Sequence, residues 1–110
     1  MTMRVSLHRC TDYEPVVVKE TIGRMLAELG GLEPCVSGKH VLLKPNFLAP
    51  RSVKKAVTTH PAVIAAVAEA ALEAGARGVS VADSPAVGKA RRVARKIGLI
   101  ELLEPLGVEV

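Results

Sequence analysis

Short apolar runs alternate with amphipathic segments along the chain, and this order limits the folds available to it. The runs rich in Val and Leu, which have the length of buried strands, are at residues 3–7, 40–44, 79–82 and 108–110. The segments with apolar residues at helical spacing are 15–29, 61–73, 87–97 and, as one short turn, 99–103. The alternation predicts an α/β fold with a three-layer parallel (Rossmann-like) sheet in the order β-α-β-α-β-α-β, wound by right-handed crossovers.

Proline and glycine mark where the expected helices begin and end. Pro15 and Pro61 suit the first helical turn, where a missing N–H is not needed. Ser84 and Pro85 are likewise typical of the start of helix 87–97. The long connection 45–60 has no clear periodicity, and connections of this length are usually functional or disordered.

Composition favours one compact domain. With 110 residues and 49% hydrophobic residues, the chain can build one core, so we expect residues 1–110 to form a single α/β module. Aromatic residues make up only 2%, which argues against the stacking platforms of nucleic-acid binding proteins and makes a nucleic-acid partner unlikely to fit. The core is expected to consist of Val, Leu, Ile and Ala.

Cysteine spacing and targeting signals bear on the cellular compartment. Cys10 and Cys35 match no metal or redox motif, so both are expected to be reduced. Neither a signal peptide nor an apolar run long enough to span a bilayer is recognisable. These features predict a cytoplasmic protein with no membrane partner.

Charge is segregated along the sequence. The net charge is +4, yet residues 34–68 and 84–100 contain ten Lys and Arg residues and no carboxylate. In helix 87–97 the cations occupy the arc opposite the apolar residues. A solvated surface is the common reason for such a face, and docking of an acidic partner is the alternative. Helix 61–73, in contrast, is apolar almost all round, which predicts burial against a sheet and against a second helix, domain or subunit, including a second copy of the chain.

A first candidate site follows the second expected strand. In parallel sheets, ligands bind beyond the carboxyl ends of the strands. Lys44 would supply a full positive charge there, and the start of helix 61–73 would supply unpaired N–H groups and threonine hydroxyls, which together favour a small anion. Simple helix capping, by a threonine or by the imidazole, is the competing interpretation. The residues of this candidate site are Lys44, Asn46, Thr58, Thr59 and His60.

A second candidate site follows the third expected strand. Asp83 and Ser84 stand at its carboxyl end, where an aspartate is typical of a ligand to ribose, a metal or a catalytic proton, or of a helix cap. The sequence has no GxGxxG, Walker, HExxH or GxSxG motif, so the corresponding nucleotide, zinc-protease and hydrolase functions are not indicated.

Three segments, in this order and at these spacings, resemble one known family. The segments VLLKPNFLAP, AVTTHPAVIAAVAEAALEAGA and GVSVADSP are similar to those of the domain of unknown function 362 family, and the opening RVSLHRCTDYEP is similar too. The resemblance implies that Lys44, Asn46, His60 and Asp83 belong to shared motifs, although it assigns none of them a catalytic role. Asp83 would then be a metal ligand or a proton acceptor.

The same resemblance implies a longer protein. Family members often carry a ferredoxin-like region with four-iron four-sulfur clusters, and such a cluster needs four cysteine thiolates at motif spacing. With two cysteines, this chain alone would hold no cluster, so a cluster is expected in the full-length protein or in a partner. The chain is therefore expected to be the N-terminal part of a longer family domain. The basic segment after DSP departs from the glycine-rich and acidic segment expected of the family.

Overall fold

The computed structural model describes residues 3–110, and its centre is a two-stranded parallel sheet. Strand β1 (His40–Leu43) pairs with strand β2 (Gly78–Val81), so that Leu42 lies opposite Ser80. A single parallel bridge joins Ser80 to Glu109 on the other edge of β2. The expected strands at 40–44 and 79–82 are thus confirmed to within a residue or two, and the one expected at 108–110 is reduced to a bridge.

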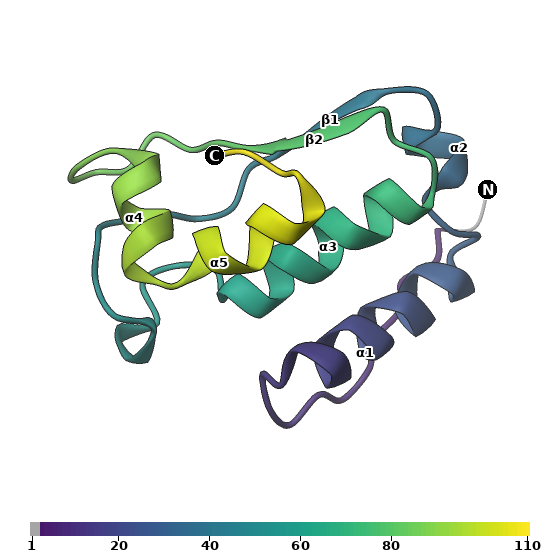
Figure 1. Cartoon of the computed structure of the whole chain (residues 1–110). Helices are drawn as coiled ribbons and strands as arrows, with labels where there is room; N and C mark the ends of the chain where they lie inside the picture. The colour runs from purple at the N-terminus through teal and green to yellow at the C-terminus, as the bar shows by residue number, and fades with distance from the viewer. Residues whose placement is uncertain (1–2) are drawn as a thin grey trace.

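The described part of the chain contains five α-helices. They are α1 (Pro15–Glu28), α2 (Glu33–Val36), α3 (Pro61–Glu73), α4 (Ala90–Lys96) and α5 (Leu99–Leu103). Helix α3 lies against both strands, and it also contacts α1 and α5 (Figure 1). Two short 3-10 helices, η1 (Val53–Lys55) and η2 (Glu104–Leu106), complete the described secondary structure.

The α/β class and the parallel pairing are confirmed, whereas the prediction of three layers is wrong for residues 3–110. Figure 1 shows the sheet at the top, with α3, α5 and α1 below it and α2 beside one end. On the opposite face of the sheet His40 and Leu42 are exposed, Leu42 to 62%. The reason is that the first expected strand does not join the sheet. Helix α1 then connects no pair of strands, and it packs on α3 as an outer helix instead.

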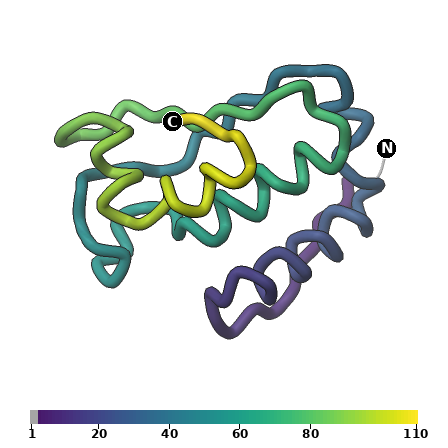
Figure 2. The backbone as a smooth tube through the Cα atoms, in the orientation of Figure 1, coloured from purple at the N-terminus to yellow at the C-terminus, as the bar shows by residue number. Residues whose placement is uncertain are grey.

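Residues 3–7, predicted to be that first strand, are extended but have no backbone hydrogen-bond partner within the described chain. They run alongside α1 (Figure 2). Their polar side chains hold them there, because Arg4, Ser6 and His8 all contact Glu28 near the end of α1, at 2.6, 2.6 and 2.7 Å. The short run rich in Val and Leu that predicts a strand is therefore attached to a helix by the polar residues within it.

The main core lies between the sheet and helices α3, α4 and α5. Phe47 is its largest fully buried side chain, at 0% exposure, in contrast to the expectation of a core built only from aliphatic residues. A second cluster, formed by Val18, Ala62 and Ala66, joins α1 to α3. Helix α3 is therefore apolar almost all round because the sheet and two helices of the same chain cover it.

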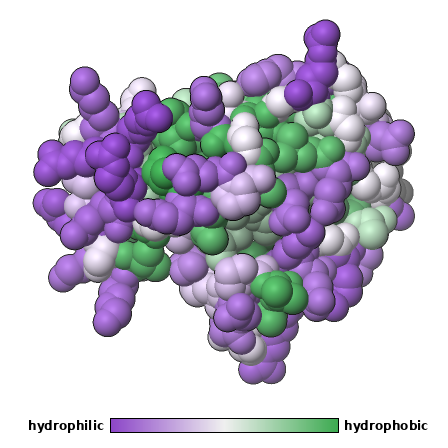
Figure 3. Space-filling model, in the orientation of Figure 1, coloured by the Kyte–Doolittle hydropathy of each residue, from purple (hydrophilic) through white to green (hydrophobic). Residues whose placement is uncertain are grey.

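The basic helix is shorter than predicted. It begins at Ala90 instead of residue 87, and Ser84 does not cap it. Residues 86–88 form bends instead, because the N–H groups of Ala86 and Val87 donate to the carbonyl oxygen of Leu48 and Gly88 has a φ of 80°. The two-faced character of the helix is confirmed, with an apolar side in the core and cations in solvent. Figure 3 shows hydrophilic residues gathered at the α4 end of the molecule.

Candidate functional site

The carboxyl ends of β1 and β2 are tied together by one ion pair. Lys44 follows β1 and Asp83 follows β2 by two residues, and the Lys44 Nζ lies 2.9 Å from the Asp83 Oδ1. The second carboxylate oxygen, Oδ2, accepts a hydrogen bond from the backbone N–H of Phe47 at 2.8 Å. Asp83 therefore positions both the lysine and the start of the loop 45–60.

The surroundings of Asp83 favour its charged form. Hydrogen bonds from the Lys44 ammonium group and from the Phe47 N–H hold the pKa of Asp83 below its usual value of 3.8. The carboxylate side chain is 9% exposed, whereas the Lys44 side chain is 74% exposed. One hydrogen of the ammonium group serves the ion pair, so two remain available to a ligand.

The two ends of the loop 45–60 are bonded to each other. Its first residues and its last run antiparallel, with a bridge between Phe47 and Thr58. Next to the bridge, the N–H of Asn46 donates to the Thr59 Oγ1 at 2.9 Å, and the N–H of Thr59 donates to the carbonyl oxygen of Asn46 at 2.9 Å. The long connection is therefore an ordered loop whose base holds Asn46 and Thr59 side by side.

A pocket of about 260 Å³ opens at this base. Lys44, Asn46 and Thr59 provide its polar groups. The Thr59 hydroxyl accepts a hydrogen bond from Asn46, which leaves its own proton free to be donated. The opposite wall is apolar and consists of Leu43, Pro45, Val63, Ile64 and Val67. The arrangement fits a ligand that combines an anionic group with an apolar part.

His60 caps helix α3. Its Nδ1 accepts a hydrogen bond from the N–H of Ala62 at 3.1 Å, and its carbonyl oxygen accepts from the N–H groups of Val63 and Ile64. The expectation of unpaired N–H groups at this helix start is therefore wrong, since His60 occupies all three. The capping interpretation of His60 is confirmed.

Tyr13 stacks on the imidazole ring of His60, with ring centroids 3.8 Å apart and an angle of 3° between the planes. No local pattern in the sequence predicts this pair, because Tyr13 stands in a polar turn far from His60 in the chain. Burial lowers the pKa of His60 below its usual value of 6.5, which keeps the ring neutral at physiological pH.

Protonation of His60 should be visible in the fluorescence of Tyr13. Neutral His60 stabilises the folded protein, and this contribution is fully present above the unfolded-state pKa near 6.5. The contribution is lost as the pH falls through the lower pKa of His60 in the folded protein, because a protonated Nδ1 cannot accept the hydrogen bond from the Ala62 N–H. Tyr13 is the single tyrosine and there is no tryptophan, so its emission reports the change directly. We expect a step with a midpoint below pH 6.5.

The control for that titration is a helix-capping residue that does not ionise. His60→Asn should remove the step and retain the cap, whereas His8→Asn, at a histidine that contacts Glu28 instead, should keep it. A step that persists in His60→Asn would show that Tyr13 reports another group.

The predicted site residues therefore divide into groups. Lys44, Asn46 and Thr59 line one pocket. Asp83 does not line this pocket but forms an ion pair with Lys44. Thr58 pairs with Phe47 in the loop, and His60 caps α3. Ser84 is exposed. The sequence predicts Val63, Ile64 and Val67 only as packing residues of helix 61–73 and does not indicate that they line a pocket.

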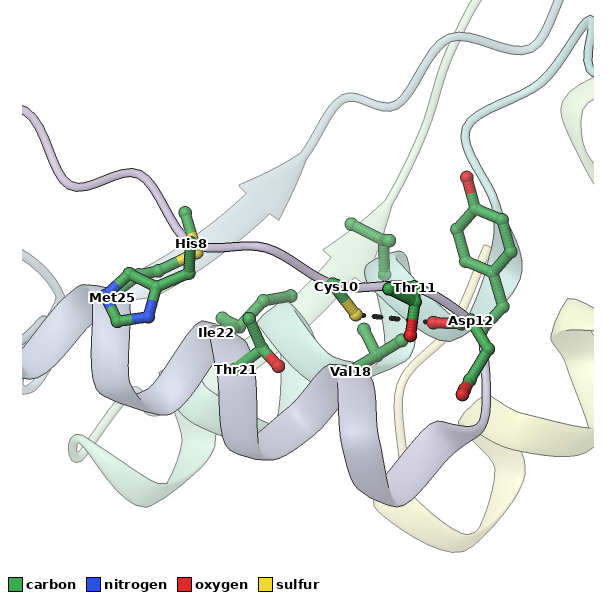
Figure 4. Close-up of a pocket in the computed structure, with 10 residues that line it drawn as sticks. His8, Cys10, Thr11, Asp12, Val18, Thr21, Ile22 and Met25 are labelled. Carbon is green, nitrogen blue, oxygen red and sulfur yellow. Dashed lines mark hydrogen bonds between the residues drawn. The ribbon is translucent and has the colours of Figure 1, made fainter.

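A further depression of about 320 Å³ lies on the other side of α3, between the segment 8–13 and α1 (Figure 4). Apolar side chains of α1, among them Val18, Ile22 and Met25, form its floor. Cys10 lies at its rim, and its thiol donates to the carbonyl oxygen of Asp12 at 3.3 Å. Nothing in the sequence indicated this depression, because it depends on the N-terminal segment lying along α1.

The residues present do not fit an iron–sulfur cluster. Cys10 and Cys35 are both free and exposed. Across residues 3–110, no three His, Cys, Asp or Glu side chains come together in a way that could hold a metal ion. Both oxygens of Asp83 already have protein partners, so its evident role in this structure is to anchor Lys44 and the loop.

Comparison with known proteins identifies the family. The domain of unknown function DUF362 matches residues 41–110, which include all the predicted site residues. The chain belongs to the DUF362 family. The resemblance noted in the KPN, TTHP and DSP segments is thereby confirmed.

One relative of this DUF362 chain is the thylakoid-associated protein sll1697 of Synechocystis sp. (strain ATCC 27184 / PCC 6803 / Kazusa). It is 39% identical over 111 residues, which cover 100% of this chain and 34% of that protein. The chain thus spans about a third of the length of this relative. No solved structure matches the chain. Within the described residues, no helix has the length and apolar character needed to cross a membrane.

Proposed function

We propose that this DUF362 chain binds a small anionic molecule with an apolar part, in the pocket at the carboxyl ends of β1 and β2. The observation that carries the proposal is the lining of that pocket. Lys44, Asn46 and Thr59 face an apolar wall within about 260 Å³, at the position where parallel sheets bind ligands. Any iron–sulfur redox chemistry would belong to a longer protein or to a partner.

The Lys44 side chain is 74% exposed and so accessible to a ligand, and its ion pair with Asp83 orients it. An ammonium group held by one ion pair approaches a ligand with little loss of conformational freedom, and this favours binding. Since the helix N–H groups are occupied by His60, Lys44 supplies most of the positive charge. The apolar wall adds affinity for the part of the ligand that bears no charge.

Phenyl phosphate is a suitable probe because it combines both features. We expect it to shift the backbone amide signals of Thr59 and Val63 in NMR titrations, and to bind more tightly than inorganic phosphate. Lys44→Met should weaken phenyl phosphate binding about 10–100-fold, because a hydrogen bond from a charged donor contributes roughly 1.5–3 kcal/mol.

Two control variants distinguish the effect of the Lys44 charge from the effect of the total charge of the protein. Lys44→Arg keeps the cation and should retain most of the affinity, while Lys39→Met removes an exposed cation at the opposite end of β1 and should change it little. The proposal fails if phosphate probes leave the pocket signals unchanged, or if Lys39→Met and Lys44→Met weaken binding equally.

We also propose that the chain works at a membrane surface, on its cytoplasmic side. The support is the name of the relative, which describes that protein as thylakoid-associated, and the basic face of α4. The sequence-based expectation of no membrane partner was drawn from the lack of a spanning segment, which peripheral association does not need. Sedimentation of the protein with phospholipid vesicles tests this second function.

A further inference from the structure

We infer, resting on that second proposed function, that the α4 end of the molecule is a docking face for anionic lipid. Its cations come from the loop 45–60, from the bends before α4 and from α4 itself. They are Arg51, Lys54, Lys55, Lys89, Arg92, Arg95 and Lys96, which we call the basic end. Arg91 is excluded, because it lines a separate depression together with Glu104 and Glu109.

The basic end has no internal neutralisation in the described chain. Residues 45–60 and 84–100 contain no carboxylate, and none of the cations of the basic end forms an ion pair within residues 3–110. Lys19, by comparison, contacts both Glu69 and Glu73. Side chains of the basic end therefore meet an external anion without first breaking an internal ion pair.

Backbone contacts bring the separate segments of the basic end together. The carbonyl oxygen of Leu48 accepts from the N–H groups of Ala86 and Val87 at 3.0 and 3.3 Å, which joins the loop 45–60 to the bends before α4. A Cβ built at Gly88 would lie 3.7 Å from the Pro50 ring, so Pro50 is located beside this glycine. Pro50 also shares a shallow depression with three cations of α4, Arg92, Arg95 and Lys96. Figure 3 shows this end of the molecule covered by hydrophilic residues.

Two exposed apolar side chains belong to the same two segments as these cations. Leu48 and Val87 are joined through their backbones, and they are 48% and 53% exposed. Exposed apolar residues flanked by cations are typical of surfaces that rest at the interface of an anionic bilayer, where apolar groups enter the boundary and cations meet headgroups. A nucleic acid is a poorer fit, because Phe47 is fully buried and Tyr13 is stacked on His60.

The test uses vesicles of phosphatidylcholine, with and without an equal part of phosphatidylglycerol. We expect the protein to sediment with the anionic vesicles only, and less as salt is raised. The variant Arg92→Glu/Arg95→Glu/Lys96→Glu should lower the partition coefficient by at least about 100-fold, since each cation near such a surface contributes about a fivefold factor. The uncharged Arg92→Gln/Arg95→Gln/Lys96→Gln variant should also bind weakly.

The matched control is Arg24→Glu/Lys39→Glu/Arg77→Glu, which changes the net charge equally at exposed positions outside the basic end. It should bind far better than the α4 variant. Leu48→Ser/Val87→Ser should also reduce binding. All variants should keep the phenyl phosphate response, which separates docking from ligand binding.

Three results would overturn the inference. Equal losses of vesicle binding in the control and α4 variants would show that binding depends on net charge alone. The protein would then still associate with membranes, but the basic end would not be its docking face. A lack of binding to any vesicle would reject both the proposed membrane association and the docking role of the basic end. Binding to polyglutamate but not to anionic vesicles would assign the basic end to an acidic protein instead.

Discussion

Replacing Phe47 with alanine is expected to lower the free energy of unfolding by about 3–5 kcal/mol, the largest effect we foresee. Phe47 is fully buried, and it packs in the main core beneath the loop that carries the pocket. Its removal leaves a cavity there and loosens the loop whose start is held by the bond from the Phe47 N–H to Asp83. A loss of this size is a large share of the total stability of a small domain. Urea denaturation followed by circular dichroism measures it.

The neighbouring residue provides the control. Leu48→Ala removes a side chain that is 48% exposed, and it should change the stability by about 0.5 kcal/mol or less. Phe47→Leu fills part of the space, so its free energy of unfolding should lie between those of Phe47→Ala and Leu48→Ala. It remains measurable if Phe47→Ala does not fold. Equal effects of Phe47→Ala and Leu48→Ala would contradict the burial of Phe47.

Replacing Leu99 with alanine is expected to cost about 2–5 kcal/mol. Leu99 begins α5, which has only five residues, and it is fully buried against the main core. So short a helix has almost no stability of its own in water, so its order depends on this contact with α3 and the sheet. We expect lower thermal stability together with faster amide hydrogen exchange in residues 99–103.

The matched control is Leu29→Ala at the end of α1, where the leucine is 45% exposed. It makes the same chemical change and should alter the stability by about 0.5 kcal/mol or less. Unchanged exchange in α5 of the Leu99→Ala variant would show that this helix is stable without the contact.

Most of the elements could be predicted from local sequence. Helices α1 and α3 have a proline near the start, a periodic apolar face and glycine after the end, and each of these signals acts within a few residues. The pairing of β1 with β2 followed from two apolar runs joined by a helical crossover. The motif residues at the carboxyl ends of these strands were located for the same reason.

The failures all concern segments whose conformation depends on distant partners. Residues 3–7 are rich in Val and Leu, as a buried strand is, but contacts with Glu28 place them on α1. Ser84 and Pro85 resemble a helix start, but Leu48 takes the N–H groups that would have begun the helix. Phe47 was assigned to an irregular loop because no local pattern shows that a loop residue enters the core.

The sequence by itself determined the α/β class, the two parallel strands, the position of the main helices and the family. These depend on periodicity and on residues close together in the chain. Tertiary structure alone decided that the described chain has two layers, that Lys44 is paired with Asp83, that Tyr13 stacks on His60, and that the loop 45–60 joins the segment before α4. The physical reason is that such contacts join residues far apart in sequence, so their formation depends on how the helices and loops pack around the sheet.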